Sequence, residues 1–321
     1  MNRRSFLQSV GVTLAFPASG AFAQLTGRPI RIVVPLPAGS SNDYVTRVIA
    51  PYLTTSLGAT IVVDNKAGGN GIIGTMDVVK SAPDGNTLLL GSLSPLATNV
   101  ALIKNLPYDP RRDLTPIAGA SVTNWVLMVK SSSPAHTLAE FIAYAKQRPG
   151  SVSIGFSTTT VQVQIATLNK MAGIELLAVP YKGTPPTITD VLGGSLDATL
   201  LDPGNALSQV KGGRMRALGV SSLKRNPVTP DWPAISETFP GFDFSAWNAL
   251  MGPPGMSRDV VTKINAAMNA ALKQKDVVAK YAEAGTQPLV MTPEEVKTFI
   301  EVETAKWVRL AKETNIQPES I

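Results

Sequence analysis

The stretch Ile30–Pro35 (IRIVVP) is a nearly continuous apolar run, and a loop of small residues, Pro35–Asp43 (PLPAGSSND), follows it directly. A run of this kind is typical of a strand that is buried on both faces, as in a parallel sheet. Apolar residues then recur at helical spacing over Tyr44–Leu57, with Asn42 or Asp43 as the expected N-cap. The segment therefore predicts a strand, a short loop and a helix.

The same alternation continues along the next fifty residues. The pattern predicts strands at Thr60–Asp64 and Thr87–Gly91, separated by a helix at Ile72–Lys80. The turn Pro83–Asn86 (PDGN) leads into the later of these strands. Strands that alternate with helices in this way predict a parallel α/β sheet.

A second set of alternating elements begins near Trp125, and helices dominate after Val260. In this second set we expect strands at Val126–Val129, Val152–Phe156, Leu176–Pro180, Ala198–Leu201 and Ala217–Val220, and helices at Leu138–Lys146, Val161–Met171 and around Ile188–Leu192. The late helices are expected at Val260–Lys273, Val277–Ala284 and Pro293–Glu313. Because the late helices need a sheet to cover, we expect the chain to enter a second domain near residue 125 and to return near 245. Two crossings would form a hinge.

The amino-acid composition alone excludes several kinds of functional site. The chain has 321 residues, no cysteine and a single histidine, His136. These counts exclude a disulfide framework, thiolate metal sites, a cysteine nucleophile and clustered histidine ligands. The net charge of +6 suggests a nucleic-acid partner, but no segment concentrates the charge beside stacking aromatic residues.

Residues 1–23 are expected to be a cleavable export signal. Arg3 and Arg4 precede a short apolar run, and Ala21–Ala23 (AFA) supplies small residues before Gln24. The segment around the two arginines also resembles a twin-arginine signal. No cysteine follows the apolar run, so a lipid anchor is not expected there, and the predicted location is the periplasm. Removing two of the 29 basic residues with the signal lowers the net charge from +6 to +4.

Three motifs that resemble catalytic or cofactor sites lack the context that such sites need. Gly69–Gly74 matches GxGxxG, but Asp64–Gly68 intervene between it and Val63 of the strand before it, so we read it as a glycine-rich turn into a helix. Ser221–Lys224 matches SxxK without a partner motif. His136 lies in a loop before a helix, with no GxSxG elbow elsewhere. No acidic or histidine cluster has metal-ligand spacing, so neither a metal nor a cofactor is expected.

Two loops of small residues offer anion sites. Pro35–Asp43 joins the first strand to a helix, and a helix N-terminus presents unpaired N–H groups and a partial positive charge. Val179–Pro186 (VPYKGTPP) repeats the arrangement in the second domain, with Lys182 as a potential partner for an anion. An ordinary helix cap would produce the same pattern, so both interpretations of the first loop stay open.

Six motifs in the same order resemble the Bug-type periplasmic solute-binding receptors of tripartite tricarboxylate transporters. The resemblance covers essentially the whole chain after the signal. The motifs are PLPAGSSND (Pro35–Asp43), NKAGGNGIIG (Asn65–Gly74), PDGNTLLLG (Pro83–Gly91), LPYDPRRDLTPI (Leu106–Ile117), VPYKGTPP (Val179–Pro186) and RMRALGVSS (Arg214–Ser222). The stretch Phe239–Pro254 resembles the return crossing of that family.

The resemblance implies an α/β fold of two lobes, the Venus-flytrap (type II) periplasmic-binding-protein fold with a double crossover hinge. Residues 24–124 and 246–321 would form lobe 1, and residues 125–245 lobe 2. Such a receptor is not an enzyme: it encloses a small organic carboxylate or dicarboxylate, which could be aromatic, and delivers it to membrane permease subunits. A monomer without nucleic-acid partners is expected. The ligand-binding residues that it implies are Leu36, Ala38, Gly39, Ser40, Ser41, Asp43, Ser92, Ser94, Thr158, Thr159, Thr160, Lys182, Gly183, Thr184 and Asp202.

Departures from the family pattern bear on the ligand. Thr158, Thr159 and Thr160 stand in a segment that is usually rich in glycine and serine, and Gln162 replaces a usual histidine. Asp202 could bind a ligand hydroxyl or simply cap the helix that follows it. Two other functions stay open: a receptor that feeds a two-component sensor, and a hydrolase that uses Ser40 or Ser157 with His136.

Overall fold

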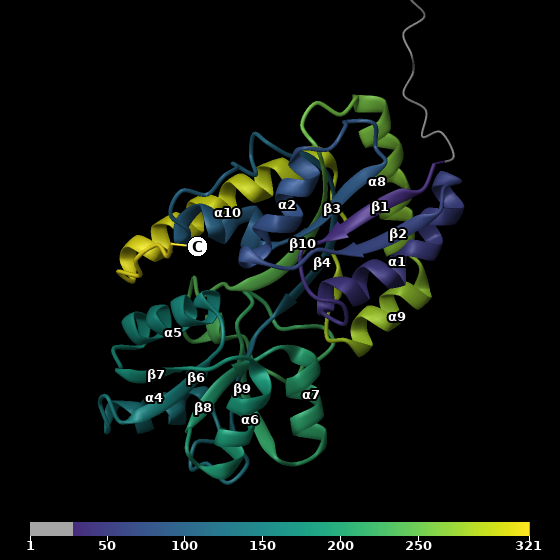
Figure 1. Cartoon of the computed structure of the whole chain (residues 1–321). Coiled ribbons are helices and arrows are strands. Elements are labelled where there is room, and N and C mark those ends of the chain that lie inside the picture. The colour runs from purple at the N-terminus through teal and green to yellow at the C-terminus, as the bar shows by residue number, and fades with distance from the viewer. Residues whose placement is uncertain (1–27, 321) are drawn as a thin grey trace, which may run out of the picture.

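The fold consists of two sheets, each covered by helices, which form the upper and lower lobes in Figure 1. The computed structural model describes residues 28–320, so the predicted signal lies outside the described residues. The first sheet has six strands in the order β11-β4-β10-β3-β1-β2, and the second has five in the order β7-β6-β8-β5-β9. Two lobes of this kind match the predicted fold class.

The first sheet takes strands from both ends of the described chain. Its strands are β1 (Ile30–Val34), β2 (Ile61–Asn65), β3 (Thr87–Ser92), β4 (Thr115–Asn124), β10 (Ser245–Gly252) and β11 (Gln287–Pro288). The helices of this lobe are α1 (Ser41–Leu57), α2 (Ile72–Val79), α3 (Asn99–Leu102), α8 (Arg258–Leu272), α9 (Lys275–Glu283) and α10 (Pro293–Glu313), with the short turns η1 (Gly69–Gly71) and η2 (Ser94–Thr98).

The second sheet is built from one continuous part of the chain. Its strands are β5 (Val126–Lys130), β6 (Val152–Phe156), β7 (Leu176–Pro180), β8 (Ala198–Leu201) and β9 (Met215–Val220). Its helices are α4 (Leu138–Lys146), α5 (Thr159–Ala172), α6 (Thr184–Gly193) and α7 (Pro203–Lys211), and the turn η3 (Ile235–Glu237) follows β9.

The three strands predicted within residues 30–92 pair in parallel as expected, but the sheet also contains antiparallel strands that the pattern did not predict. Strand β1 pairs in parallel with β2 and β3, but β10 lies between β3 and β4 and is antiparallel to both. The sheet is therefore mixed. Neither β4 nor β10 has the continuous run of large apolar residues that marks β1, because small and polar residues interrupt both. The local sequence of β4 therefore does not predict a strand.

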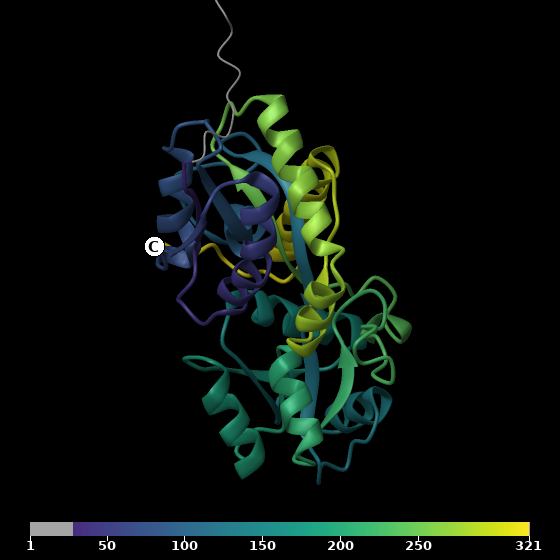
Figure 2. The same cartoon turned by 90° about the vertical axis from the view of Figure 1, so that its right-hand side faces the viewer.

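Two short segments carry the chain between the lobes. Strand β4 ends at Asn124 in the first sheet, and β5 begins at Val126 in the second. The return runs from Val220, at the end of β9, to Ser245, at the start of β10. Figure 2 shows β4 and β5 running from one lobe into the other. The exact division of the chain into lobes at 124/125 and 245/246 stays a prediction.

Both faces of each sheet are buried, which is why the strands carry so many apolar residues. On one face of the first sheet, Ile30 and Ile32 of β1 pack with α1 and α8 residues such as Ile49 and Ile264. Val33 of β1 belongs to a larger core that includes α10 and continues into the second lobe. On one face of the second sheet, residues of α6 and α7 such as Val191 and Ala206 form a separate core with the strands. Each lobe therefore has one core of its own, and a third core is shared between the lobes.

Local chemistry corrects the predicted start of the first helix. The expected caps were Asn42 and Asp43, but α1 begins at Ser41 and its N-cap is Ser40, whose Oγ accepts a hydrogen bond from the backbone N–H of Asp43. A serine in extended conformation one residue before the first turn is the usual cap. Asn42 and Asp43 therefore lie inside the first turn, where their side chains are free for other contacts.

Candidate functional site

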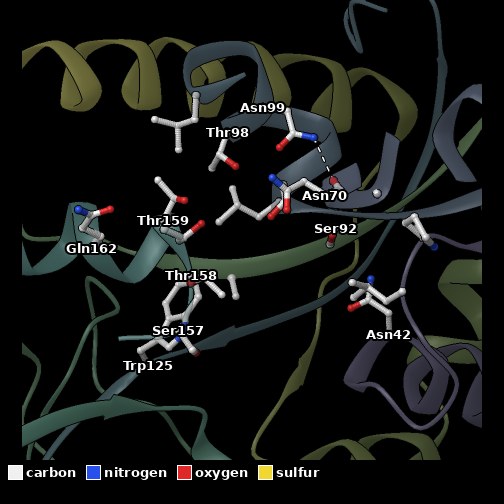
Figure 3. A pocket seen from close by; sticks show the side chains of 18 of the residues that line it. Asn42, Asn70, Ser92, Thr98, Asn99, Trp125, Ser157, Thr158, Thr159 and Gln162 are labelled. Atoms are coloured by element: carbon white, nitrogen blue, oxygen red, sulfur yellow. Dashed lines mark hydrogen bonds between the residues drawn. The ribbon is translucent and has the colours of Figure 1, made fainter. Parts of the chain in front are cut away.

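A cavity of about 750 Å³ lies between the lobes, and we call it the interlobe cavity. It falls within the range of small-molecule sites in proteins. The residues that line it are Pro35, Leu36, Ser41, Asn42, Asn70, Gly71, Ser92, Leu93, Ser94, Thr98, Asn99, Leu102, Ile103, Thr123, Trp125, Phe156, Ser157, Thr158, Thr159, Thr160, Gln162, Pro180, Tyr181, Ala246, Trp247, Asn248 and Glu319. Figure 3 shows Asn42 and Ser92 on one side and Thr158, Thr159 and Gln162 on the other.

The loop between β1 and α1 supplies part of the wall. Leu36 and Ser41 line the cavity, whereas Ala38, Gly39, Ser40 and Asp43 do not. The last four residues shape the loop instead. Gly39 has φ +80°, and its backbone N–H donates to Asp43 Oδ2 at 2.9 Å.

Asp43 is buried and has a structural partner on its own helix. The Arg47 guanidinium donates to both of its carboxylate oxygens at 3.0 Å. This bond, together with the backbone bond from Gly39, holds the pKa of the Asp43 carboxyl below its usual range. A carboxylate that is already bound in this way stabilises the loop and stays ionised.

Asn42 is the polar side chain in this wall that stands out chemically. It is 3% exposed, and its Nδ2 is a buried donor without a hydrogen-bond partner among the described residues. An unpartnered buried donor costs free energy of about 1–3 kcal/mol. Asn42 lies in the first turn of α1, where the helix dipole also favours an anion. A bound carboxylate would satisfy both features.

The carboxyl end of β3 adds hydroxyl and amide groups. Ser92 ends the strand, and Ser94 and Thr98 belong to the turn η2 that follows. Asn70 adopts a left-handed conformation with φ +51° in η1, and its carbonyl accepts from Asn99 Nδ2 at 3.0 Å. This bond, drawn in Figure 3, holds the glycine-rich turn against η2. The GxGxxG segment is thus a turn into α2, as its context predicts.

The second lobe presents the N-terminus of α5 to the cavity. Thr158 is the N-cap, and its Oγ1 accepts from the backbone N–H of Val161 at 3.3 Å. Thr158, Thr159 and Thr160 all line the cavity, as does Gln162. The cavity therefore lies between two helix N-termini, α1 in one lobe and α5 in the other.

Four further predicted site residues, all in the second lobe, also lie outside this cavity wall. Lys182, Gly183 and Thr184 are at the start of α6 and do not line the cavity; Tyr181, one residue earlier, does. The Tyr181 hydroxyl donates to Asp190 Oδ2 at 2.5 Å, and this bond raises the pKa of Tyr181. Asp202 is the N-cap of α7, where it accepts from the backbone N–H of Asn205 at 3.0 Å.

Apolar and aromatic groups form another part of the cavity wall. Leu36, Trp125, Phe156 and Trp247 contribute this part of the wall. The Trp247 indole is fixed in position by a hydrogen bond, in which its Nε1 donates to the buried carboxylate of Glu303 at 3.0 Å. Such a wall suits a ligand whose middle is hydrocarbon or an aromatic ring.

Sequence reasoning missed Asn42, Asn70, Asn99 and Trp125 as parts of the wall. Two signals were available. Asn70 stands between glycines in a predicted turn, where asparagine tolerates positive φ, and Trp125 stands at the predicted crossing. Nothing in the sequence marks Asn99, because it reaches the cavity through the turn η2, which has no simple pattern.

Within the described residues, the side chains of the alternative hydrolase, His136 with Ser40 or Ser157, do not line one cavity. His136 is exposed before α4 and does not line the cavity that holds Ser157. Within residues 28–320 no group of three or more His, Asp or Glu side chains could hold a metal ion. The described helices also include none long and apolar enough to cross a membrane.

Comparison with known proteins identifies the family. The sequence profile described as "Tripartite tricarboxylate transporter family receptor" matches residues 45–316. Protein BugT of Bordetella pertussis is 34% identical over 323 residues, which cover 98% of each chain. The solved structure "R. palustris Rpa4515 with adipate" is 31% identical with a TM-score of 0.80, covering 92% of this chain and 100% of the other. "MatC (Rpa3494) from Rhodopseudomonas palustris with bound malate" is 29% identical with a TM-score of 0.73, covering 88% and 98%. The chain therefore belongs to the tripartite tricarboxylate transporter receptor family, among the Bug-type solute-binding proteins.

Proposed function

We propose that the mature chain captures a small organic carboxylate between its lobes in the periplasm and delivers it to the permease subunits of a tripartite transporter. Removal of residues 1–23 would release it as an unanchored monomer. Membership of the receptor family supports transport, and the two relatives described with adipate and with malate support a carboxylate ligand. In this proposal lobe 1 comprises residues 24–124 and 246–321, and lobe 2 comprises residues 125–245.

The observation that carries the proposal is the buried amide of Asn42. Asn42 lines the cavity at the N-terminus of a 17-residue helix, and its buried Nδ2 has no hydrogen-bond partner among the described residues. A ligand carboxylate at this position would accept from the amide and from N–H groups of the first turn. A neutral alcohol or amide would gain less, because hydrogen bonds to charged groups are about twice as strong as those between neutral groups.

The far end of the ligand would meet the second lobe. Thr158 and Thr159 offer hydroxyls at the N-terminus of α5, and Gln162 offers an amide that can donate or accept. These groups can bind a second carboxylate or a neutral polar group. The apolar part of the wall favours a ligand that also carries a hydrocarbon or aromatic group. Ligand binding then favours the closed arrangement only by the contacts that both lobes make together.

The same site supports capture without catalysis. The groups that line the cavity are hydroxyls, amides and apolar side chains, together with Glu319 and the Tyr181 phenol. His136, the base that a serine hydrolase would need, is on the exposed start of another helix. The net positive charge of the mature chain is spread over nearly 300 residues, which supports anion capture over nucleic-acid binding.

A thermal-shift panel tests the proposal. Mono- and dicarboxylates of four to eight carbons, including aromatic acids, are each compared with the corresponding neutral amide. A ligand at 100 times its dissociation constant should stabilise the protein by about 2.7 kcal/mol, while the amide should not. If no acid raises the melting temperature above its amide, carboxylate capture is wrong.

Uptake measurements in a deletion strain distinguish delivery of the ligand to a permease from delivery to a sensor. A strain that lacks the receptor gene should lose uptake of the radiolabelled acid while its permease genes remain. If uptake is normal and only the transcriptional response to the acid is lost, the receptor feeds a sensor instead.

A further inference from the structure

The interlobe cavity has an unusual charge balance for an anion site. Among the described residues that line it, Glu319 is the single one with a charged side chain at neutral pH, and none is lysine, arginine or histidine. Attraction for an anion thus comes from helix N-termini, amides and hydroxyls. Glu319 opposes that attraction wherever it faces the ligand.

Glu319 is held in place although it lies near the end of the chain. Its backbone N–H donates to the carbonyl of Leu102 at 2.8 Å, and its carbonyl accepts from the N–H of Lys104 at 2.8 Å. These bonds form a parallel bridge between residues 103 and 319. These bonds fix the backbone of Glu319 at the cavity wall, and its exposed side chain extends from there.

The carboxylate of Glu319 lies beside the second-lobe helix. Thr159 Oγ1, in the first turn of α5, donates to Glu319 Oε1 at 3.5 Å. None of the described lysine, arginine or histidine side chains comes within 4.0 Å of it. Glu319 thus places an uncompensated negative charge at the point where the far end of a bound ligand would meet α5.

We propose that Glu319 is a specificity-determining residue of the ligand site, an inference that rests on the proposed function. It disfavours a second ionised carboxylate at the α5 end, because two like charges at close range repel. It favours a hydrogen-bond donor there, a hydroxyl or an ammonium group, which its carboxylate can accept. The preferred ligand then carries one carboxylate for the Asn42 end and a donor for the Glu319 end.

The test compares matched ligands on the full mature chain. For each chain length from four to six carbons, the dissociation constants of the α,ω-diacid and of the ω-hydroxy acid are measured by calorimetry. Wild type should bind the hydroxy acid more tightly than the diacid of equal length. Glu319→Gln should shift the ratio toward the diacid by about threefold to fivefold, the upper part of the range expected for one exposed charge pair. The glutamine keeps the backbone bridge.

Glu301→Gln is the matched control, because it removes the same charge from an exposed site of α10 outside the cavity wall. This variant should leave the ratio within twofold of wild type. If Glu319→Gln leaves the ratio unchanged while acids still bind, the role of Glu319 is wrong and the proposed function stands. An equal shift in both variants would reduce the effect to net charge and overturn the proposal. If no acid binds wild type at all, both fail.

Discussion

The Ser221 hydroxyl accepts a hydrogen bond from the backbone N–H of Trp125 at 2.8 Å, which joins the two segments that cross between the lobes. The same hydroxyl donates to the carbonyl of Phe244 at 2.6 Å, and Ser221 is fully buried. One side chain therefore binds the outgoing crossing at 125 and the returning crossing at 244. Any movement of the lobes about this hinge has to preserve or break these bonds.

Ser221→Ala should destabilise the hinge. The substitution leaves the Trp125 N–H and the Phe244 carbonyl buried without partners, which costs about 1–3 kcal/mol. The melting temperature should fall by several degrees. Ser222→Ala is the control, because its hydroxyl is bonded on the surface to the carbonyl of Lys224. Equal losses in the two variants would show that Ser221 does not join the crossings energetically.

Glu303 should matter more than other acids of α10. It is 5% exposed, accepts from Trp247 Nε1 and pairs with Lys306. Glu303→Ala therefore leaves a buried donor without a partner and removes the nearer of the two carboxylates that pair with Lys306. We expect a loss of about 2–4 kcal/mol in chemical unfolding. Glu301→Ala, on the exposed face of the same helix, should cost under about 0.5 kcal/mol. A small loss for Glu303→Ala would contradict this reading.

Alanine variants of two glycines, Gly39 and Gly58, distinguish the cost of backbone strain from an effect on ligand binding. Gly39 in the β1–α1 loop has φ +80° and Gly58 at the end of α1 has φ +65°, and neither has an atom near the place of an added Cβ. Alanine at either site should cost about 1 kcal/mol, because positive φ is unfavourable for a residue with a Cβ. Both variants should melt earlier. Only Gly39→Ala should also weaken acid binding in a titration, and an unchanged affinity would move the site away from this loop.

Because the Asp43 carboxylate is bound to Arg47, we expect the stability of the fold to depend on pH in the acid range. Its bond with Arg47 lowers the pKa of Asp43 in the folded state, so the ionised form stabilises the fold above the ordinary pKa of about 4. That contribution is lost as the pH falls through the lower folded value. Asp43→Asn should thus melt below wild type at pH 7, and the gap should close toward pH 2.

Arg47→Gln provides the matching partner variant. If the pair acts as a unit, the double variant should melt close to the single variants at pH 7, since either change already removes the bond. Additive losses would show that Asp43 acts through the Gly39 N–H alone.

Elements with a strong local signal could be predicted closely from the sequence. Helix α10 begins at Pro293 and ends at Glu313 as expected, because Thr292 and Glu295 form a capping box around a proline in the first turn. Strands β6, β7 and β8 also have their expected bounds. Each is a short apolar run between turn residues, so composition alone defines its ends.

Strand β4 and the cavity wall could not be predicted from the sequence, because both depend on pairing between segments that are distant in the chain. Strand β4 contains glycine, alanine, serine and threonine, and it becomes a strand because β10 pairs along it across more than 120 residues. The cavity wall has the same origin. Asn42 and Asn99 lie 57 positions apart, and only the pairing of β1 with β3 brings their segments together. Local patterns predicted the loops but not which side chains face the ligand.

The central claim, that the buried amide of Asn42 receives a ligand carboxylate, is tested most directly by one calorimetric titration series. The best-binding acid is titrated into wild type, Asn42→Asp and Asn105→Asp, the last being the same change at an exposed site of the same lobe. Asp in the first turn suits the helix, so the fold should remain, while the new charge repels the ligand. We predict at least about a 30-fold loss of affinity for Asn42→Asp and less than a twofold change for Asn105→Asp. An Asn42→Asp protein that binds the acid as tightly as wild type would contradict the account.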